Sequence, residues 1–255
     1  MTEKATHQAP PGRPEVRDDR LEERPGALRG GATLTLQTRQ AQQLVKGRGY
    51  RADRPAIIGL IGFANLVRTI WHGARADDPY ADWWMLKVHD ALERAAEELA
   101  ATASLVATRF QASGPLEVDS PAADKPARIA LNFSNPYAFQ AARLVGNYDD
   151  LARAVLSARH VGLVTRAEAE QLLHRGGRVV RHALQSPVGY RLLGVTREDV
   201  KQGTAKALQA HEMMGGVPAE VLSGEHRAPH APAIVVRSPS PTSNPTGLRS
   251  LPSLG

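Results

Sequence analysis

Two short stretches of the sequence alternate apolar and polar residues with the two-residue period of a strand, whereas the longer segments around them place apolar residues at helical spacing. In residues 33–38, threonine and glutamine alternate with leucine. In residues 128–133, Ile129, Leu131 and Phe133 share one face. A chain with so few strand segments cannot build a large sheet. The sequence therefore predicts a mainly helical α+β fold with two short strands.

Helices are predicted wherever apolar spacings of three and four coincide with start and stop signals. Residues 39–46 form the first such segment. Residues 55–74 are apolar around most of the helix circumference, which predicts a place in the core. A long helix should begin at Asp78, an acidic N-cap followed by proline at the first helical position. Thr165 opens a capping box with the glutamate three residues later, and Thr196 should precede one further continuous helix.

The most informative order of elements lies in residues 127–160. Residues 134–136 cap a helix after the second strand, Gly146-Asn147 can break it, and residues 148–160 resume helical spacing. Strand, helix, turn and helix is the order of a ribbon-helix-helix domain, whose paired strands enter the DNA major groove. This interpretation predicts an elaborated ribbon-helix-helix-like fold with a long helical insertion. The alternative is a strand of an ordinary α+β fold with a solvated outer face.

The polar positions of the two strands are the candidate base contacts, namely Arg128 and Asn132 on one strand and Thr33, Thr35 and Gln37 on the other. Arginine can bind the guanine edge in the major groove, and asparagine can bind adenine. The ribbon could combine strands from the two protomers of a homodimer, or both strands could come from one chain. One feature opposes DNA binding here, because Asp149-Asp150 would place negative charge at the helix start that usually approaches a phosphate.

The formal net charge of +6 makes an anionic partner plausible, and most of the basic excess belongs to the segment between the two tails. Three arginines fall largely on one side of a predicted helix and could bind phosphates, or they could form a solvated face paired with acids: Arg175, Arg178 and Arg181. Three tryptophans could stack on bases, but all sit in or beside apolar helical stripes, which favours core packing: Trp71, Trp83 and Trp84.

No catalytic constellation is recognisable. The absence of cysteine excludes disulfides, thiolate nucleophiles and sulfur-ligated zinc. His211-Glu212 lacks the second histidine that a helical zinc protease needs, and phosphate-cradling glycine loops are missing. The acidic pairs Asp77-Asp78 and Asp149-Asp150 fall at predicted helix starts, where carboxylates stabilise the helix dipole. We therefore expect a protein that is not an enzyme and has no metal or cofactor.

Composition divides the chain into three parts. Residues 1–30 are charged, polar and nearly free of aliphatic side chains, and residues 224–255 are rich in proline and serine, so both are predicted to be disordered tails. The domain should span residues 31–223. The N-terminus lacks the apolar run of a signal peptide, and Asn65 and Arg68 interrupt the most apolar segment. These features predict a cytoplasmic protein with no membrane partner.

Four stretches together resemble the PFL family of proteins encoded on integrating conjugative elements: LTLQTRQAQQL from Leu34, DDPYADWWMLKVHDAL from Asp77, NPYAFQAARLVGNYDDLARAVLSARHVGL from Asn135 and GYRLLGVTREDV from Gly189. The sequence is also similar to the wider group of AcaB-like regulators of conjugative plasmids. The resemblance covers nearly all of the predicted domain and neither tail.

The resemblance implies a ribbon-helix-helix protein that binds double-stranded DNA and regulates transfer-gene promoters. It supplies no list of base-contacting residues, so the candidate contacts rest on strand alternation alone. The alternative, of a different class, is a non-enzymatic accessory or scaffold protein that binds other proteins of the conjugation or DNA-processing machinery. The apolar face of residues 55–74 and the long helix after Pro79 could build such an interface.

Overall fold

The computed structural model describes residues 32–50, 52, 56–114, 118 and 123–235, which lie in one compact unit that begins at Ala32. The elements follow the chain in the order β1 (Ala32–Leu36), α1 (Arg39–Lys46), α2 (Leu60–Arg75), α3 (Pro79–Gln111), β2 (Ala127–Leu131), α4 (Pro136–His160), α5 (Arg166–Gln185), α6 (Arg197–Gln202), α7 (Ala205–Met214) and α8 (Ala219–Ser223). The described part is therefore mainly helical with two short strands, which confirms the predicted fold class at this level.

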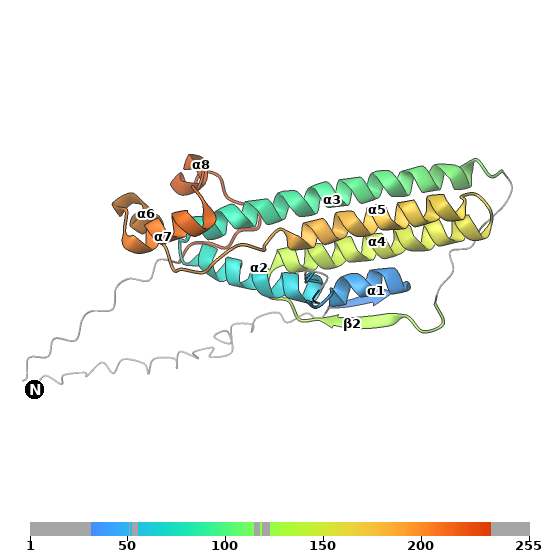
Figure 1. Cartoon of the computed structure of the whole chain (residues 1–255), viewed down its shortest axis with the longest axis horizontal. Helices are drawn as coiled ribbons and strands as arrows, with labels where there is room; N and C mark the ends of the chain where they lie inside the picture. The colour runs from blue at the N-terminus through green and yellow to red at the C-terminus, as the bar shows by residue number, and fades with distance from the viewer. Residues whose placement is uncertain (1–31, 51, 53–55, 115–117, 119–122, 236–255) are drawn as a thin grey trace, which may run out of the picture. The chain divides into compact units, whose positions relative to one another are not determined.

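The two strands pair with each other in one antiparallel sheet. Thr33 lies opposite Ala130 and Thr35 lies opposite Arg128. Of the two arrangements left open by the sequence, the structure therefore has the one in which both strands belong to a single chain. Figure 1 shows the two-stranded ribbon formed by β1 and β2 along one side of the molecule, beside α1 and away from α3.

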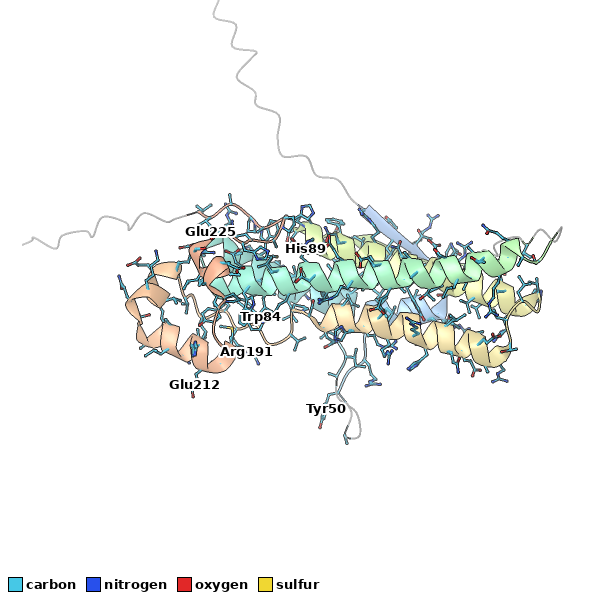
Figure 2. The ribbon with its side chains drawn as sticks, turned by 90° about the horizontal axis from the view of Figure 1, so that it is seen from above. Tyr50, Trp84, His89, Arg191, Glu212 and Glu225 are labelled. Carbon is cyan, nitrogen blue, oxygen red and sulfur yellow. The ribbon has the colours of Figure 1, made fainter. Side chains whose placement is uncertain are left out.

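Four helices build the core on which the ribbon rests. The 33-residue helix α3 packs against α2, α4 and α5, and it extends along almost the whole described domain in both views (Figures 1 and 2). Helix α2 is central, and its side chains that face the other helices, including Phe63, Val67 and Ile70, are fully buried, whereas Ile61 is 45% exposed. Most of its apolar surface is therefore used within the domain, as the sequence predicted.

Local capping determines where most helices begin. Side chains accept hydrogen bonds from the first-turn backbone NH groups of five helices, and these N-caps are Thr38, Asp78, Asn135, Thr165 and Thr196. The capping box predicted at Thr165 is present, with Glu168 bonding back to the cap. Such caps depend on residues two or three positions apart, which is why the sequence predicts them well.

Two predicted helix boundaries are wrong. Helix α4 runs through Gly146-Asn147 without a break, so the strand, helix, turn and helix order expected within residues 127–160 is absent. Burial explains the continuity, since Val145, Tyr148 and Asp149 on either side all pack into the core. Conversely, the helix expected after Thr196 is divided into α6 and α7 at Gly203, whose φ of 63° ends α6 in the left-handed conformation.

The segment after α8 also differs from the prediction of a tail starting at residue 224. It stays packed on the core through Val235, and Ala228 within it is buried. Arg227 reaches the fully buried carboxylate of Asp82 with two hydrogen bonds of 2.9 Å. The backbone NH of Val235 donates to the carbonyl of Arg75. The remainder of the predicted tail, and residues 1–30, lie outside the described residues.

The link between α1 and α2 makes a close backbone crossing. Gly47 has a φ of 69°, and a Cβ added at Gly47 or Gly59 would collide with backbone atoms of the other segment. Only glycine permits this approach. Beyond the crossing, the link carries Tyr50, whose side chain stands away from the helices and is 78% exposed (Figure 2).

Candidate nucleic-acid interface

The ribbon has one apolar and one polar face. Side chains alternate between the two faces along each strand, and the pairing register places like positions of β1 and β2 on the same face. Both strands show the same succession of half-buried and exposed residues, ending in a buried leucine at Leu36 and Leu131. These leucines hold the inner face against the core. A register shift of one residue would turn them to solvent, so the register is strongly specified.

The outer face of the ribbon brings together residues that are far apart in the sequence. Thr33, Thr35, Arg128 and Ala130 are all exposed on it. Asn132 follows the end of β2 and is exposed as well. Four of the five predicted base contacts are therefore solvent-accessible, and three of them belong to one continuous two-stranded surface.

Gln37, the fifth predicted base contact, has a different environment. It lies just after β1, is half-buried, and its side-chain amide oxygen accepts a 2.9 Å hydrogen bond from the backbone NH of Ala123. Its acceptor therefore joins the end of β1 to the segment that leads into β2.

Asp149 fixes the turn between β1 and α1. This mid-helical carboxylate of α4 is 3% exposed and accepts hydrogen bonds from the backbone NH of Gln37 at 2.7 Å, the backbone NH of Thr38 at 2.8 Å and the Thr38 hydroxyl at 2.7 Å. The expectation that Asp149 and Asp150 lie at a helix start is thus wrong. Of the two charges expected to oppose DNA binding, that of Asp149 instead anchors the ribbon, while the Asp150 side chain is exposed and pairs with Arg153. Sequence alone could not identify this role, because the partners are more than 100 residues away.

The arginines of α5 form a second basic surface. Arg175 and Arg178 are exposed, whereas Arg181 is half-buried beside Gly177 and Tyr148. Helix α5 packs mainly against α3 and α4, while the ribbon meets α4 through β1. Arg178 also lines a hollow shared with Arg94 and Glu98 of α3. The structure therefore does not merge these arginines with the ribbon into one patch.

The tryptophans belong to the packing of α2 and α3, as favoured from the sequence. Trp84 is buried, and Trp71 and Trp83 are half-buried against the core. The ammonium group of Lys87 lies 3.4 Å from the ring centre of Trp83 and 3.7 Å from that of Trp84. Burial lowers the pKa of Lys87. With their faces covered by this cation, these two rings are poorly placed to stack on bases.

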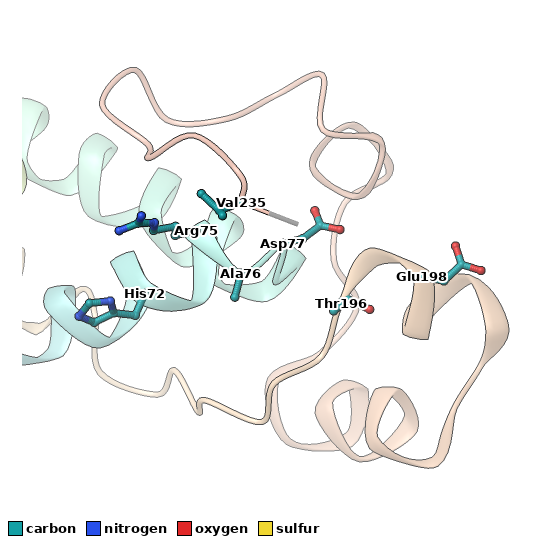
Figure 3. A pocket seen from close by; sticks show the side chains of 7 residues that line it. All are labelled: His72, Arg75, Ala76, Asp77, Thr196, Glu198 and Val235. Atoms are coloured by element: carbon teal, nitrogen blue, oxygen red, sulfur yellow. The ribbon is translucent and has the colours of Figure 1, made fainter. Parts of the chain in front are cut away.

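A hollow lies between the end of α2 and the start of α6 (Figure 3). Its lining includes both acidic and basic side chains and consists of His72, Arg75, Ala76, Asp77, Thr196, Glu198 and Val235. The carboxylate of Asp77 is already paired with Arg197, which also holds Asp82 at 2.6 Å. Within the described residues, no group of three or more metal-ligating side chains is present. No helix in this part of the chain is long and apolar enough to cross a membrane.

Comparison with known proteins shows a family match and a similar solved structure. The profile of a family described as transcriptional regulator AcaB matches residues 24–235. The fold is similar to the crystal structure of selenomethionine-containing AcaB from uropathogenic E. coli, with a TM-score of 0.55 and 12% sequence identity. The match covers 77% of this chain and 95% of that chain. No curated protein matches the sequence significantly.

Proposed function

Because the chain belongs to the AcaB family of transcriptional regulators, we propose that it binds double-stranded DNA and regulates conjugative transfer genes on an integrating conjugative element. The observation that carries the proposal is the ribbon, whose inner face is held in the core and whose outer face is polar and exposed. A two-stranded ribbon of this kind fits the major groove of B-DNA.

The dimensions and side chains of the ribbon support this role. Paired strands lie about 4.8 Å apart and the major groove is about 12 Å wide, so the two-stranded ribbon, with strands about 16 Å long, can lie along the groove floor. Arg128 would bind the two acceptors of a guanine edge and Asn132 an adenine edge, with Thr33 and Thr35 contacting neighbouring bases. The Asp149 anchor would hold this surface rigid during binding.

Phosphate contacts would come from the basic surface of α5. Arg175, Arg178 and Arg181 would neutralise backbone charge without sequence preference, and a net charge of +6 favours association with a polyanion. Since α5 does not pack on the ribbon, DNA bound to both surfaces would have to curve around the domain or pass over α4. Counter-ion release makes the affinity fall with salt, and each lost phosphate contact lowers that dependence by about one unit of slope.

The test is a gel-shift titration of the full chain with duplexes from upstream of the element's transfer genes. Specific affinity above that for random duplex is expected, and the double substitution Arg128→Ala with Asn132→Ala should abolish most of the preference. Each good base contact is worth about 1–3 kcal/mol, so the loss should be roughly 10-fold or more. Arg178→Ala should weaken specific and random binding alike.

Arg191→Ala is the matched control for charge. Arg191 is exposed beside α7, at the end of the domain far from the ribbon (Figure 2). This variant should bind the specific duplex almost as the parent does. Equal affinity for specific and random duplexes in the parent protein would refute sequence-specific regulation. If the variant with Arg128→Ala and Asn132→Ala keeps its preference for the specific duplex, residues other than these two recognise the bases.

An accessory role in the conjugation machinery is the second candidate. The surface that could bind a partner differs from the one predicted from the sequence. The apolar side chains of α2 are mostly buried in the core, with Ile61 as the exposed exception, so this helix offers no extended apolar face to a partner. The exposed large apolar side chains near α7 are instead Val188, Leu192, Leu208 and Met213. Co-purification of transfer or DNA-processing proteins, lost in a Leu208→Ser variant and accompanied by unaltered transfer-gene transcripts on deletion, would favour this role.

A further inference from the structure

The chain contains the elements of two ribbon-helix-helix units. The first is β1 followed by α1 and α2, and the second is β2 followed by α4 and α5, with α3 inserted between them. The two strands pair with each other, and the helices of the first unit pack on those of the second, α1 against α4 and α5 and α2 against α4. One chain thus provides what two protomers provide in a dimeric ribbon.

The apolar helix faces of both units are largely covered within the chain. Leu44 and Val45 of α1 are buried, as are Val145 and Leu151 of α4 and Val180 of α5. Among the residues that the structure describes, α1, α4 and α5 carry no large exposed apolar side chain, and α2 carries one, Ile61, which is 45% exposed. These helices therefore leave no extended apolar face for a second chain to cover.

The outer face of the ribbon is chemically asymmetric. In a ribbon made of two identical strands, a two-fold axis gives each residue a symmetric copy, so the DNA site is palindromic. Here Thr35 faces Arg128 and Thr33 faces Ala130, and the positive charge lies on one strand only. The two ends of the surface therefore present different hydrogen-bonding groups to the groove.

We propose that a single chain is the complete reading unit and recognises an asymmetric duplex site of about five base pairs in one major groove, the length that a ribbon of about 16 Å can follow at 3.4 Å per base pair. This inference rests on the proposed DNA-binding function. It departs from the alternative in which the two protomers of a homodimer combine their strands into the ribbon. Arg128 determines the orientation of the chain on the DNA, because it is the cationic group of the ribbon's outer face.

The experiment selects duplexes from a pool with a randomised core, using the full chain, and then measures the mass of the complex with the recovered duplex. One chain of 27.5 kDa per duplex and a motif without two-fold symmetry are expected. Repeating the selection with Arg128→Ala should relax one position of the motif. A palindromic motif that binds two chains, with two symmetric positions relaxed by the substitution, would overturn the inference and leave DNA binding intact. No enrichment over the unselected pool would overturn both.

A disulfide test addresses the ribbon without DNA. The chain has no cysteine, so a variant with Thr33→Cys and Ala130→Cys places the only two thiols at directly opposite positions of the ribbon. Oxidation should give a cross-linked monomer. A mixture of the two single-cysteine variants should give no disulfide-linked heterodimer above the level seen with thiols at exposed control positions such as Arg191→Cys. Covalent dimers from the double variant would show that strands are exchanged between chains and would overturn the inference.

Discussion

Replacing Asp149 with alanine removes the group that joins the ribbon to α4. The carboxylate is 3% exposed and accepts three hydrogen bonds of 2.7–2.8 Å from Gln37 and Thr38. Hydrogen bonds to a charged group contribute about 1.5–3 kcal/mol each, but burying the carboxylate offsets part of that sum. Both partner residues are half-buried, so water can reach some of the donors that the substitution leaves open. We expect the free energy of unfolding to fall by about 3 kcal/mol.

The measurement is urea unfolding followed by circular dichroism, together with the thermal midpoint. For a domain of this size, about 3 kcal/mol corresponds to a decrease of roughly 6–12 °C in Tm. Asp150→Ala is the matched control, because it removes the same charge from the neighbouring residue, whose side chain is 75% exposed and pairs with Arg153 at 3.4 Å. That exposed pair should contribute less than about 0.5 kcal/mol.

Equal stability losses in the Asp149→Ala and Asp150→Ala variants would refute the anchoring role. DNA titration separates anchoring from simple repulsion. If the carboxylates merely repelled phosphate, both variants would bind DNA more tightly and to a similar extent. The anchoring argument instead predicts weaker specific binding for Asp149→Ala only, since the β1 side of the ribbon would lose its fixed position.

Three further outcomes can be checked by equilibrium unfolding. Burial raises the pKa of Asp78 to about 6 from 3.8, so the folded state holds this proton more tightly than the unfolded chain and loses about 3 kcal/mol of stability as the pH rises from about 4 to 6. Asp78→Asn keeps an N-cap acceptor and should remove that pH dependence, and an unchanged pH profile would count against it. Arg227→Met leaves the fully buried carboxylate of Asp82 with one arginine partner and should cost about 3 kcal/mol, so a loss below about 1 kcal/mol would contradict the buried pairing. Gly59→Ala should destabilise by about 2 kcal/mol or more because its Cβ meets backbone, whereas Gly49→Ala, with open space around it, should be nearly neutral.

Glycines within helices show why local rules predict some features and miss others. The sequence predicted a helix break at Gly146-Asn147, yet α4 continues through it, and α5 likewise continues through Gly176-Gly177. At Gly176 an added Cβ would lie 3.1 Å from side-chain atoms of Leu151 and Tyr148, so glycine permits the close approach of α5 to α4. Glycine in a helix costs about 1 kcal/mol, which packing of this kind readily outweighs.

The candidate site also has some features that the sequence predicts and others that depend on distant residues. Alternation within residues 33–38 and 128–133 correctly placed Thr33, Thr35 and Arg128 on a solvated strand face, because the side-chain period of a strand is a local property. The environment of Gln37 was not predictable, since its partner Ala123 lies beyond three helices. The buried pairing of Arg227 with Asp82 also joins distant positions and reaches into the stretch predicted to be a tail.

The sequence by itself determined the strand faces, the helix caps and the mainly helical class, because each depends on residues within a few positions of one another. Tertiary structure alone decided that β1 and β2 pair within one chain, that Asp149 anchors the ribbon, and that the domain continues to Val235. The physical reason is that a strand's alternation specifies which face is buried but not which partner satisfies its backbone. That partner is selected by the packing of α1 and α4 beneath the ribbon, which brings the two strands to the same surface.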